Sequence, residues 1–224
     1  MQILNTSQRS LLKAAAESKL GSKIYFTGGT LLSHHYLQHR LSVDLDFFSD
    51  DLLDDILVAS EIKSIAGRVK AKNVRHVRFP NRWQYFFEFS SGEVKFDIVY
   101  FPFSRVAKRI ILPEFDIKAD SLKDIAVNKV HACFERDAPR DAFDLFCIMQ
   151  KTGWRLRELL TGVEKKFGVN IDLVHLTAKL LASIDRLDDL KPLFIGKAPS
   201  AKKMKVFFEK ESAQYLKSQL KNRP

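Results

Sequence analysis

Residues 24–48 read IYFTGGTLLSHHYLQHRLSVDLDFF. The run Lys23–Thr27 is rich in β-forming residues and ends at a Gly-Gly pair, and Thr30–Gln38 then has apolar residues at helical spacing. Val43–Phe48 alternates acidic and apolar residues, a pattern typical of a strand. The sequence therefore predicts a strand, a glycine turn, a helix and an acidic strand within about twenty-five residues.

The acidic residues of this stretch suggest a metal site. Asp44 and Asp46 are two residues apart on the expected strand, so both carboxylates leave the same face. Neighbouring carboxylates repel each other and are tolerated when a divalent cation lies between them. Asp97 lies within the apolar run Val94–Phe101, where an ionised carboxylate needs a partner or a metal. The alternatives are a solvated strand end for the first two residues and an ion pair with Arg or Lys for Asp97.

The glycines suggest an anion site. Gly28 and Gly29 allow a ligand to approach the backbone closely, and the first N–H groups of the following helix attract anions. Thr30 is placed to cap that helix or to contact a phosphate. A plain turn is the alternative for the glycine pair.

The remaining sequence divides into a mixed half and a helical half. Helices are expected at residues 5–19 and Leu52–Ala66, and an antiparallel meander at Val74–Phe79, Trp83–Phe89 and Val94–Phe101. After Pro113 the pattern is helical to the end, with helices at Leu122–Glu135, Arg140–Lys151, Leu156–Lys166, Asp172–Ile184 and Ala201–Leu220. We predict an α+β protein with a mixed sheet in an N-terminal domain, residues 1–115, and an all-helical domain, residues 116–224.

The charge balance points to a polyanionic partner. The formal net charge is +10, which favours nucleic acid over a membrane because no amphipathic anchor stands out. The chain has no run of about 18 apolar residues and no evident signal peptide, so a cytoplasmic protein without a membrane span is expected. A basic tail either contacts an RNA backbone or forms a solvated helix face: Lys202, Lys203, Lys205, Lys210, Lys217, Lys221 and Arg223.

Two blocks of sequence resemble a known family. Gly28-Gly-Thr-Leu, followed by Arg40-x-Ser-x-Asp-x-Asp-Phe-Phe, is similar to the AbiEii/AbiGii-type toxin family of nucleotidyltransferases, within the DNA polymerase β-like superfamily. The second block has Lys129 on one helix and Arg140-Asp-x-x-Asp144-Leu on the next. The resemblance spans residues 24–150. It implies the nucleotidyltransferase fold and metal-dependent transfer of NMP from an NTP to an acceptor, with RNA, and tRNA in particular, as the expected acceptor.

The resemblance also implies roles for individual residues. Mg²⁺ or Mn²⁺ is expected on Asp44, Asp46 and Asp97, with Lys129 as a further catalytic residue that reaches a phosphate. The residues expected to bind the nucleotide are Gly28, Gly29, Thr30, Arg40, Ser42, Lys129, Asp141 and Asp144. Ser42 binds phosphate or is itself modified. The alternative for the second block is a structural network in which Lys129 or Arg140 pairs with Asp141 or Asp144. A cytoplasmic toxin with an antitoxin that need not contact the chain is expected.

Two other classes of function stay open. A non-enzymatic nucleotide- or RNA-binding module would bind an NTP without turnover. A metal-dependent nuclease also uses carboxylate clusters, but it needs no cradle for a triphosphate, so the Gly-Gly turn argues against it.

Overall fold

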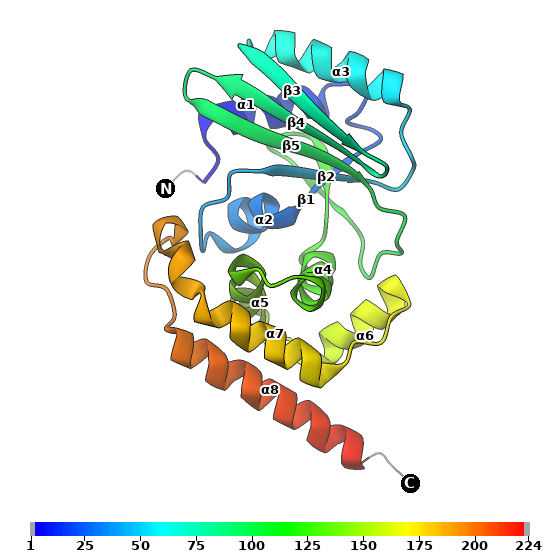
Figure 1. Ribbon diagram of the computed structural model, residues 1–224. Helices are drawn as coiled ribbons and strands as arrows, with labels where there is room; N and C mark the ends of the chain where they lie inside the picture. The colour runs from blue at the N-terminus through cyan, green and yellow to red at the C-terminus, as the bar shows by residue number, and fades with distance from the viewer. Residues whose placement is uncertain (1–2, 222–224) are drawn as a thin grey trace. The chain divides into compact units, whose positions relative to one another are not determined.

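The computed structural model describes residues 3–221 and divides the chain into two compact units (Figure 1). The first unit runs to Phe103 and resumes at Ala107–Leu122, and the second contains Ser104–Val106 and the chain from Lys123 onward. The first unit contains α1 Thr6–Ala16, β1 Tyr25–Thr27, α2 Gly28–Leu31, a π-helix Leu32–Leu37, β2 Leu45–Ser49, α3 Asp55–Arg68, β3 Asn73–Phe79, β4 Arg82–Phe89, β5 Gly92–Tyr100, β6 Ile110–Leu112 and β7 Ile117–Ala119. This is the mixed sheet that the sequence predicts.

The strands form one seven-stranded sheet in the order β3-β4-β5-β2-β1-β7-β6. β2 runs parallel to β5 and antiparallel to β1, and β1 runs parallel to β7. The meander β3-β4-β5 is antiparallel, as its turns predict. The sheet is therefore mixed, and the acidic strand β2 lies between two strands that are distant from each other in the sequence.

Local sequence explains the helices of this unit. Asn5 and Gln8 form a capping box at the start of α1, so Asn5 is the N-cap. The Asp54 side chain caps α3 by accepting from the Leu57 N–H. The single helix expected at Thr30–Gln38 is instead the short α2 followed by the π-helix, and it ends where Gln38 adopts a left-handed conformation.

The second unit is all-helical, as predicted. It contains α4 Leu122–Glu135, α5 Pro139–Thr152, α6 Leu156–Phe167, α7 Leu173–Asp185, a 3-10 helix Leu187–Leu193 and α8 Ala201–Lys221. α7 and α8 lie side by side (Figure 1). Its core is formed by fully buried residues from these helices, among them Val127, Leu145, Ile148, Leu159, Val163, Leu176 and Leu180.

The expectation of helix throughout the chain after Pro113 is wrong at one place. Ile117–Ala119 forms β7, which pairs with both β1 and β6. Three residues are too few to show a strand pattern, so only the tertiary pairing defines this strand. The first compact unit consequently extends to Leu122, whereas the division into domains at residues 115 and 116 stays a prediction. Within residues 3–221, no helix is both long and apolar enough to cross a membrane.

Candidate active site in the sheet unit

A row of polar side chains crosses the centre of the sheet. In the strand register Thr27 lies opposite Asp46, Asp46 opposite Asp97, and Asp97 opposite Gln84. Residues that pair in register project to the same face of a sheet. The residues immediately beside this row project to the other face, and in β2 they are the buried Leu45 and Phe47. Asp46 and Asp97 are therefore neighbours on one face, whereas Asp44, which was expected on the same strand as Asp46, lies just before β2.

The glycine turn touches this row directly. A Cβ added to Gly28 would lie 2.3 Å from Oδ2 of Asp46, so only a glycine leaves room for that carboxylate. Gly28 also has a φ of +76°, a left-handed conformation that side chains rarely adopt. A Cβ on Gly29 would lie 2.5 Å from Nη2 of Arg40 and 3.3 Å from Oγ of Ser42. The structure thus brings the turn, Arg40, Ser42 and Asp46 together.

The segment that leads into β2 is held from two sides. The Thr30 hydroxyl donates to the backbone carbonyl of Asp44. The buried Gln8 amide donates to the carbonyls of Ser42 at 3.0 Å and Val43 at 3.1 Å. Thr30 therefore fixes the backbone at the first aspartate rather than capping the helix; a phosphate contact for its hydroxyl stays a prediction.

Cationic and amide side chains surround Asp97, which is only 1% exposed. Lys95 Nζ lies 3.0 Å from Asp97 Oδ2 and 3.2 Å from Asp44 Oδ2, so it bridges the two carboxylates. Arg82 forms an ion pair with Asp97, and the Gln84 amide donates to Oδ1 of Asp97 at 3.0 Å. Asp97 therefore forms the ion pairs with Arg and Lys that were the alternative to a metal site.

The charge on Lys95 reflects this environment. Burial by itself lowers the pKa of the Lys95 ammonium, but the hydrogen bonds and negative charges of Asp97 and Asp44 outweigh burial and raise the pKa above its usual value. Lys95 is therefore positively charged at neutral pH, and it balances the two carboxylates that it bridges.

The three carboxylates provide the type of ligand that Mg²⁺ and Mn²⁺ prefer. Asp46 and Asp97 are in register, and Asp44 shares Lys95 with Asp97, so the three carboxylates belong to one part of the sheet surface. As arranged in residues 3–221, no three His, Cys, Asp or Glu side chains form a group that could hold a metal ion. An ion shared by the three carboxylates stays a prediction, and it requires the Lys95 ammonium to move aside.

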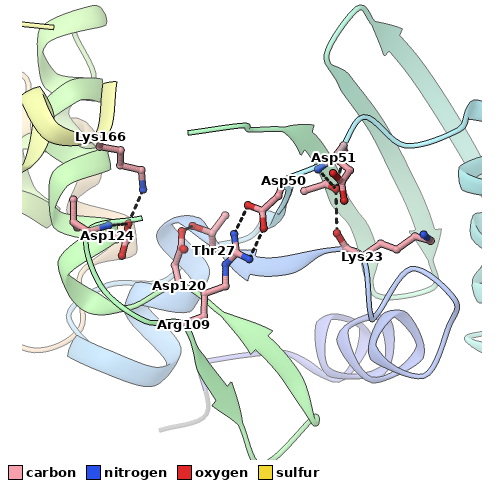
Figure 2. Close-up of polar contacts among 10 residues, drawn as sticks. Lys23, Thr27, Asp50, Asp51, Arg109, Asp120, Asp124 and Lys166 are labelled. Carbon is pink, nitrogen blue, oxygen red and sulfur yellow. Dashed lines mark hydrogen bonds and ion pairs between the residues drawn. The ribbon is translucent and has the colours of Figure 1, made fainter. Parts of the chain in front are cut away.

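A buried carboxylate next to β1 was not predicted from the sequence. Asp120 is 1% exposed and follows β7, and its Oδ2 accepts a 2.7 Å hydrogen bond from the hydroxyl of Thr27 (Figure 2). Its backbone N–H donates to Phe26, and its carbonyl accepts from the hydroxyl of Tyr36. Asp120 thus ties the end of β1 to β7 beside Gly28. Because β7 was not predicted, no pattern in the sequence placed this residue near the site.

The opposite end of β1 is fixed by Arg109. Its guanidinium lies 3.3 Å from the centre of the Tyr25 ring and makes two hydrogen bonds, of 2.7 and 2.6 Å, to the carboxylate of Asp50 (Figure 2). Both ends of this three-residue strand are therefore held by side chains from distant parts of the sequence.

The second block of the predicted site forms a buried cluster within the helical unit. Lys129 Nζ lies 2.6 Å from Oδ1 of Asp141 and 2.6 Å from Oδ2 of Asp144. Arg136 adds a 2.8 Å contact to Asp141, whereas Arg140 is exposed. Burial raises the pKa of the Asp141 carboxyl, but Lys129 and Arg136 outweigh burial and hold that pKa below its usual value. The ion-pair network expected as the alternative for Asp141 and Asp144 is present, and a phosphate contact of Lys129 stays a prediction.

Comparison with known proteins gives a family match and one curated relative. The family model described as "Nucleotidyl transferase AbiEii toxin, Type IV TA system" matches residues 10–205. The uncharacterized protein aq_aa25 of Aquifex aeolicus (strain VF5) is 28% identical over 227 residues, which cover 97% of this chain and 100% of that protein.

Solved structures share the fold. A putative nucleotidyltransferase from Helicobacter pylori aligns with a TM-score of 0.61 at 18% identity, covering 97% of this chain and 95% of its own. JHP933 of the same species aligns with a TM-score of 0.56 at 17% identity, covering 96% and 93%. The nucleotidyltransferase toxin MenT4 of Mycobacterium tuberculosis aligns with a TM-score of 0.50 at 19% identity, covering 81% of this chain and 62% of its own.

Proposed function

The chain belongs to the AbiEii family of nucleotidyltransferase toxins, and on this premise we propose that it transfers a nucleoside monophosphate from an NTP to an RNA acceptor in a metal-dependent reaction. The acceptor hydroxyl oxygen forms a bond to the α-phosphorus of the NTP, and the bond from that phosphorus to the β-phosphate oxygen breaks. Pyrophosphate leaves with the electron pair, and the hydroxyl proton passes to solvent or to a carboxylate of the site.

One observation carries this proposal. The turn that suits a phosphate lies directly against Asp46, which pairs in register with Asp97. A nucleotidyltransferase needs both elements together, because the triphosphate must be held while carboxylates act beside its α-phosphate. A nuclease needs only the carboxylates, so the contact between Gly28 and Asp46 favours transfer over hydrolysis.

The order of residues across the sheet suggests where the two substrates bind. The glycine turn adjoins Asp46 on β2, whereas Asp97 lies one strand farther from the turn. We therefore assign the triphosphate to the Gly28-Gly29 side and the acceptor hydroxyl to the Asp97 side. Backbone N–H groups of the turn, with Arg40 and Ser42 beside Gly29, orient the phosphates.

Mg²⁺ or Mn²⁺, held by Asp44, Asp46 and Asp97, would stabilise negative charge on the attacking and leaving oxygens. Lys95 neutralises two of these carboxylates, Asp44 and Asp97. A phosphate contact is also proposed for Lys129, whose ammonium pairs with Asp141 and Asp144 within the helical unit.

Membership of this toxin family implies an NTP substrate and an antitoxin as partners. The antitoxin need not contact the chain, because it can oppose the toxin through another target. We place the activity in the cytoplasm, where NTPs and RNA are available. tRNA is the acceptor that we would test first.

Incubating the full chain with each α-labelled NTP, Mg²⁺ and total RNA tests the proposal. Transfer of label to RNA, lost on addition of a chelator, is the expected result. Binding of NTP without transfer would instead indicate a non-enzymatic module, and shortening of the RNA would indicate a nuclease. Either of these outcomes would overturn the proposal.

A further inference from the structure

The helical unit contains a groove far in sequence from the proposed active-site residues of the sheet unit. The turn after α5 and one side of α8 enclose a hollow of about 310 Å³, lined among others by Trp154, Phe207 and Lys210. A second hollow, of about 210 Å³, is lined by Arg157 and shares Arg155, Glu211 and Gln214 with the first. The shared lining makes the two hollows one feature, the α8 groove.

Aromatic rings form part of the groove wall. Phe207 packs edge-on against Phe146, with ring centroids 5.2 Å apart. The backbone N–H of Trp154 donates to the Thr152 hydroxyl at 3.2 Å, and Lys123 Nζ lies 4.1 Å from the centre of the Trp154 ring. Aromatic side chains offer flat faces on which unpaired nucleic-acid bases stack, whatever the identity of the base.

The acidic residue in the groove is already neutralised. Glu211 is 7% exposed and accepts hydrogen bonds from Arg155 Nε at 3.0 Å and from the Leu156 N–H at 3.1 Å. Arg155 Nη2 also lies 2.8 Å from the other carboxylate oxygen. Arg157 and Lys210 are exposed cations on the same lining. The groove therefore presents positive charge to a ligand.

α8 extends this charge as a row. Lys203, Lys210 and Lys217 are exposed and recur every seven residues, so they share one face of the helix at intervals of about 10 Å, from a rise of about 1.5 Å per residue. Among the residues that the structure describes, these three lysines form no ion pair with an acidic side chain. Lys205, by contrast, is paired with Asp185. Arg223 of the basic tail lies outside the described residues.

We propose that the α8 groove binds a single-stranded segment of RNA, with Lys203, Lys210 and Lys217 on phosphates along the strand and an unpaired base stacked on Trp154. The unneutralised lysine row complements a polyanion, and the amides of Gln150 and Gln214 offer donors and acceptors to a base edge. An acidic protein segment would use the lysines but would gain nothing specific from the aromatic wall. The identification of this RNA as the acceptor rests on the proposed function.

The test measures binding of a fluorescein-labelled 20-nucleotide oligouridylate to the full chain by anisotropy over a range of salt concentrations. The variant Lys203→Gln/Lys210→Gln loses two charges of the row. Its matched control, Lys202→Gln/Lys205→Gln, loses two charges of the same helix outside the row. At 0.1 M salt the row variant should bind roughly 25-fold more weakly. The slope of log K against log salt should become smaller in magnitude by about 1.4, because each of the two lost phosphate contacts contributes about 0.7.

The stacking contact has a different signature. Trp154→Ala should weaken binding about tenfold and leave the salt slope unchanged, whereas Trp154→Phe should retain most of the affinity. Thermal unfolding of both variants controls for a loss of fold. The proposal would be overturned if the two double lysine variants weakened binding equally, or if Trp154→Phe weakened it as much as Trp154→Ala. It would also be overturned if the chain bound polyglutamate and did not bind the oligouridylate.

The two proposals fail separately. Asp46→Asn should abolish label transfer and leave oligouridylate binding intact, because Asp46 lies outside the groove. If the wild-type chain binds oligouridylate through the groove but transfers no label to RNA, the proposed function fails and the RNA site stands. If label is transferred to RNA while the groove variants bind normally, the groove proposal fails alone.

Discussion

The carboxylate of Asp46 rests against Gly28 so closely that a Cβ added to Gly28 would lie 2.3 Å from Oδ2 of Asp46. The glycine is therefore required twice, once for its left-handed φ of +76° and once for the space that Asp46 occupies. A substitution at Gly28 would therefore both strain the turn and displace the Asp46 carboxylate. The glycine turn and the acidic strand of the proposed site are coupled in this way.

Gly28→Ala is expected to lower nucleotide transfer by on the order of a hundredfold, because a displacement of about 1 Å at a catalytic group has an effect of that size. Gly168→Ala is the matched control. Its φ is +68°, and a Cβ there would meet no atom within 4 Å, so it carries the backbone strain without the clash. Equal loss of transfer in both variants, measured with labelled NTP, would show that the contact with Asp46 is unimportant.

Asp46→Asn removes one negative charge and keeps the shape of the side chain. Transfer should fall by several orders of magnitude, in line with the several kcal/mol that metal ions contribute to such reactions. The midpoint of thermal unfolding should hold or rise, because repulsion from the neighbouring carboxylates is relieved. Asp116→Asn, at an exposed position of the same unit, is the control. Transfer at the wild-type rate in Asp46→Asn would refute the assignment.

Lys95→Met tests whether the ammonium and a divalent cation compete. Lys95 lies 3.0 Å from Asp97 and 3.2 Å from Asp44, so its removal leaves excess negative charge between them. Without metal the variant should be less stable by on the order of 1 kcal/mol, the range for a partly exposed pair. Added Mg²⁺ should raise its unfolding midpoint more than that of the wild type. Lys118→Met, at an exposed position of β7, is the control. The prediction would be contradicted if Mg²⁺ raised the unfolding midpoints of the wild type, Lys95→Met and Lys118→Met equally.

The sequence was sufficient to predict the local elements that carry the proposed site. The strand, the glycine turn and the acidic strand lie within about twenty-five residues, where alternation and glycine chemistry act over short distances. Lys95 is two residues before Asp97 on β5 and shares its face, so the alternation of the strand could also have predicted the Lys95–Asp97 pair. The resemblance to the family was confirmed over residues 10–205.

The remaining parts of the site depend on tertiary register. Arg82 and Gln84 reach Asp97 because β4 pairs with β5, and nothing near Asp97 in the sequence marks them as partners. Asp120 reaches Thr27 through β7, a strand too short to predict from its pattern. Contacts of this kind become visible only when the order of strands in the sheet is known.

The buried cluster around Lys129 provides a prediction on stability. The ammonium contacts Asp141 and Asp144 at 2.6 Å each, and both carboxylates are almost completely buried. Removing one member of such a cluster costs free energy because its partners stay buried with less compensation. Asp141→Asn keeps the packing and leaves Asp144 on Lys129, so the loss of unfolding free energy at pH 7 should be about 1–3 kcal/mol.

The pH dependence of that loss follows from the pKa of Asp141, which is held below its usual value by Lys129 and Arg136 against the opposing effect of burial. The folded-state pKa of Asp141 lies below the unfolded value of about 3.9. The ionised carboxylate therefore stabilises the fold fully at pH values above that unfolded pKa. This stabilisation is lost as the pH falls through the folded-state pKa. Urea unfolding from pH 7 to pH 2 should therefore show the gap between wild type and Asp141→Asn narrowing below about pH 4. Asp188→Asn, on the exposed 3-10 helix, should show no such gap. A gap for Asp141→Asn that stays constant down to pH 2 would mean that ionisation of this carboxylate does not stabilise the cluster.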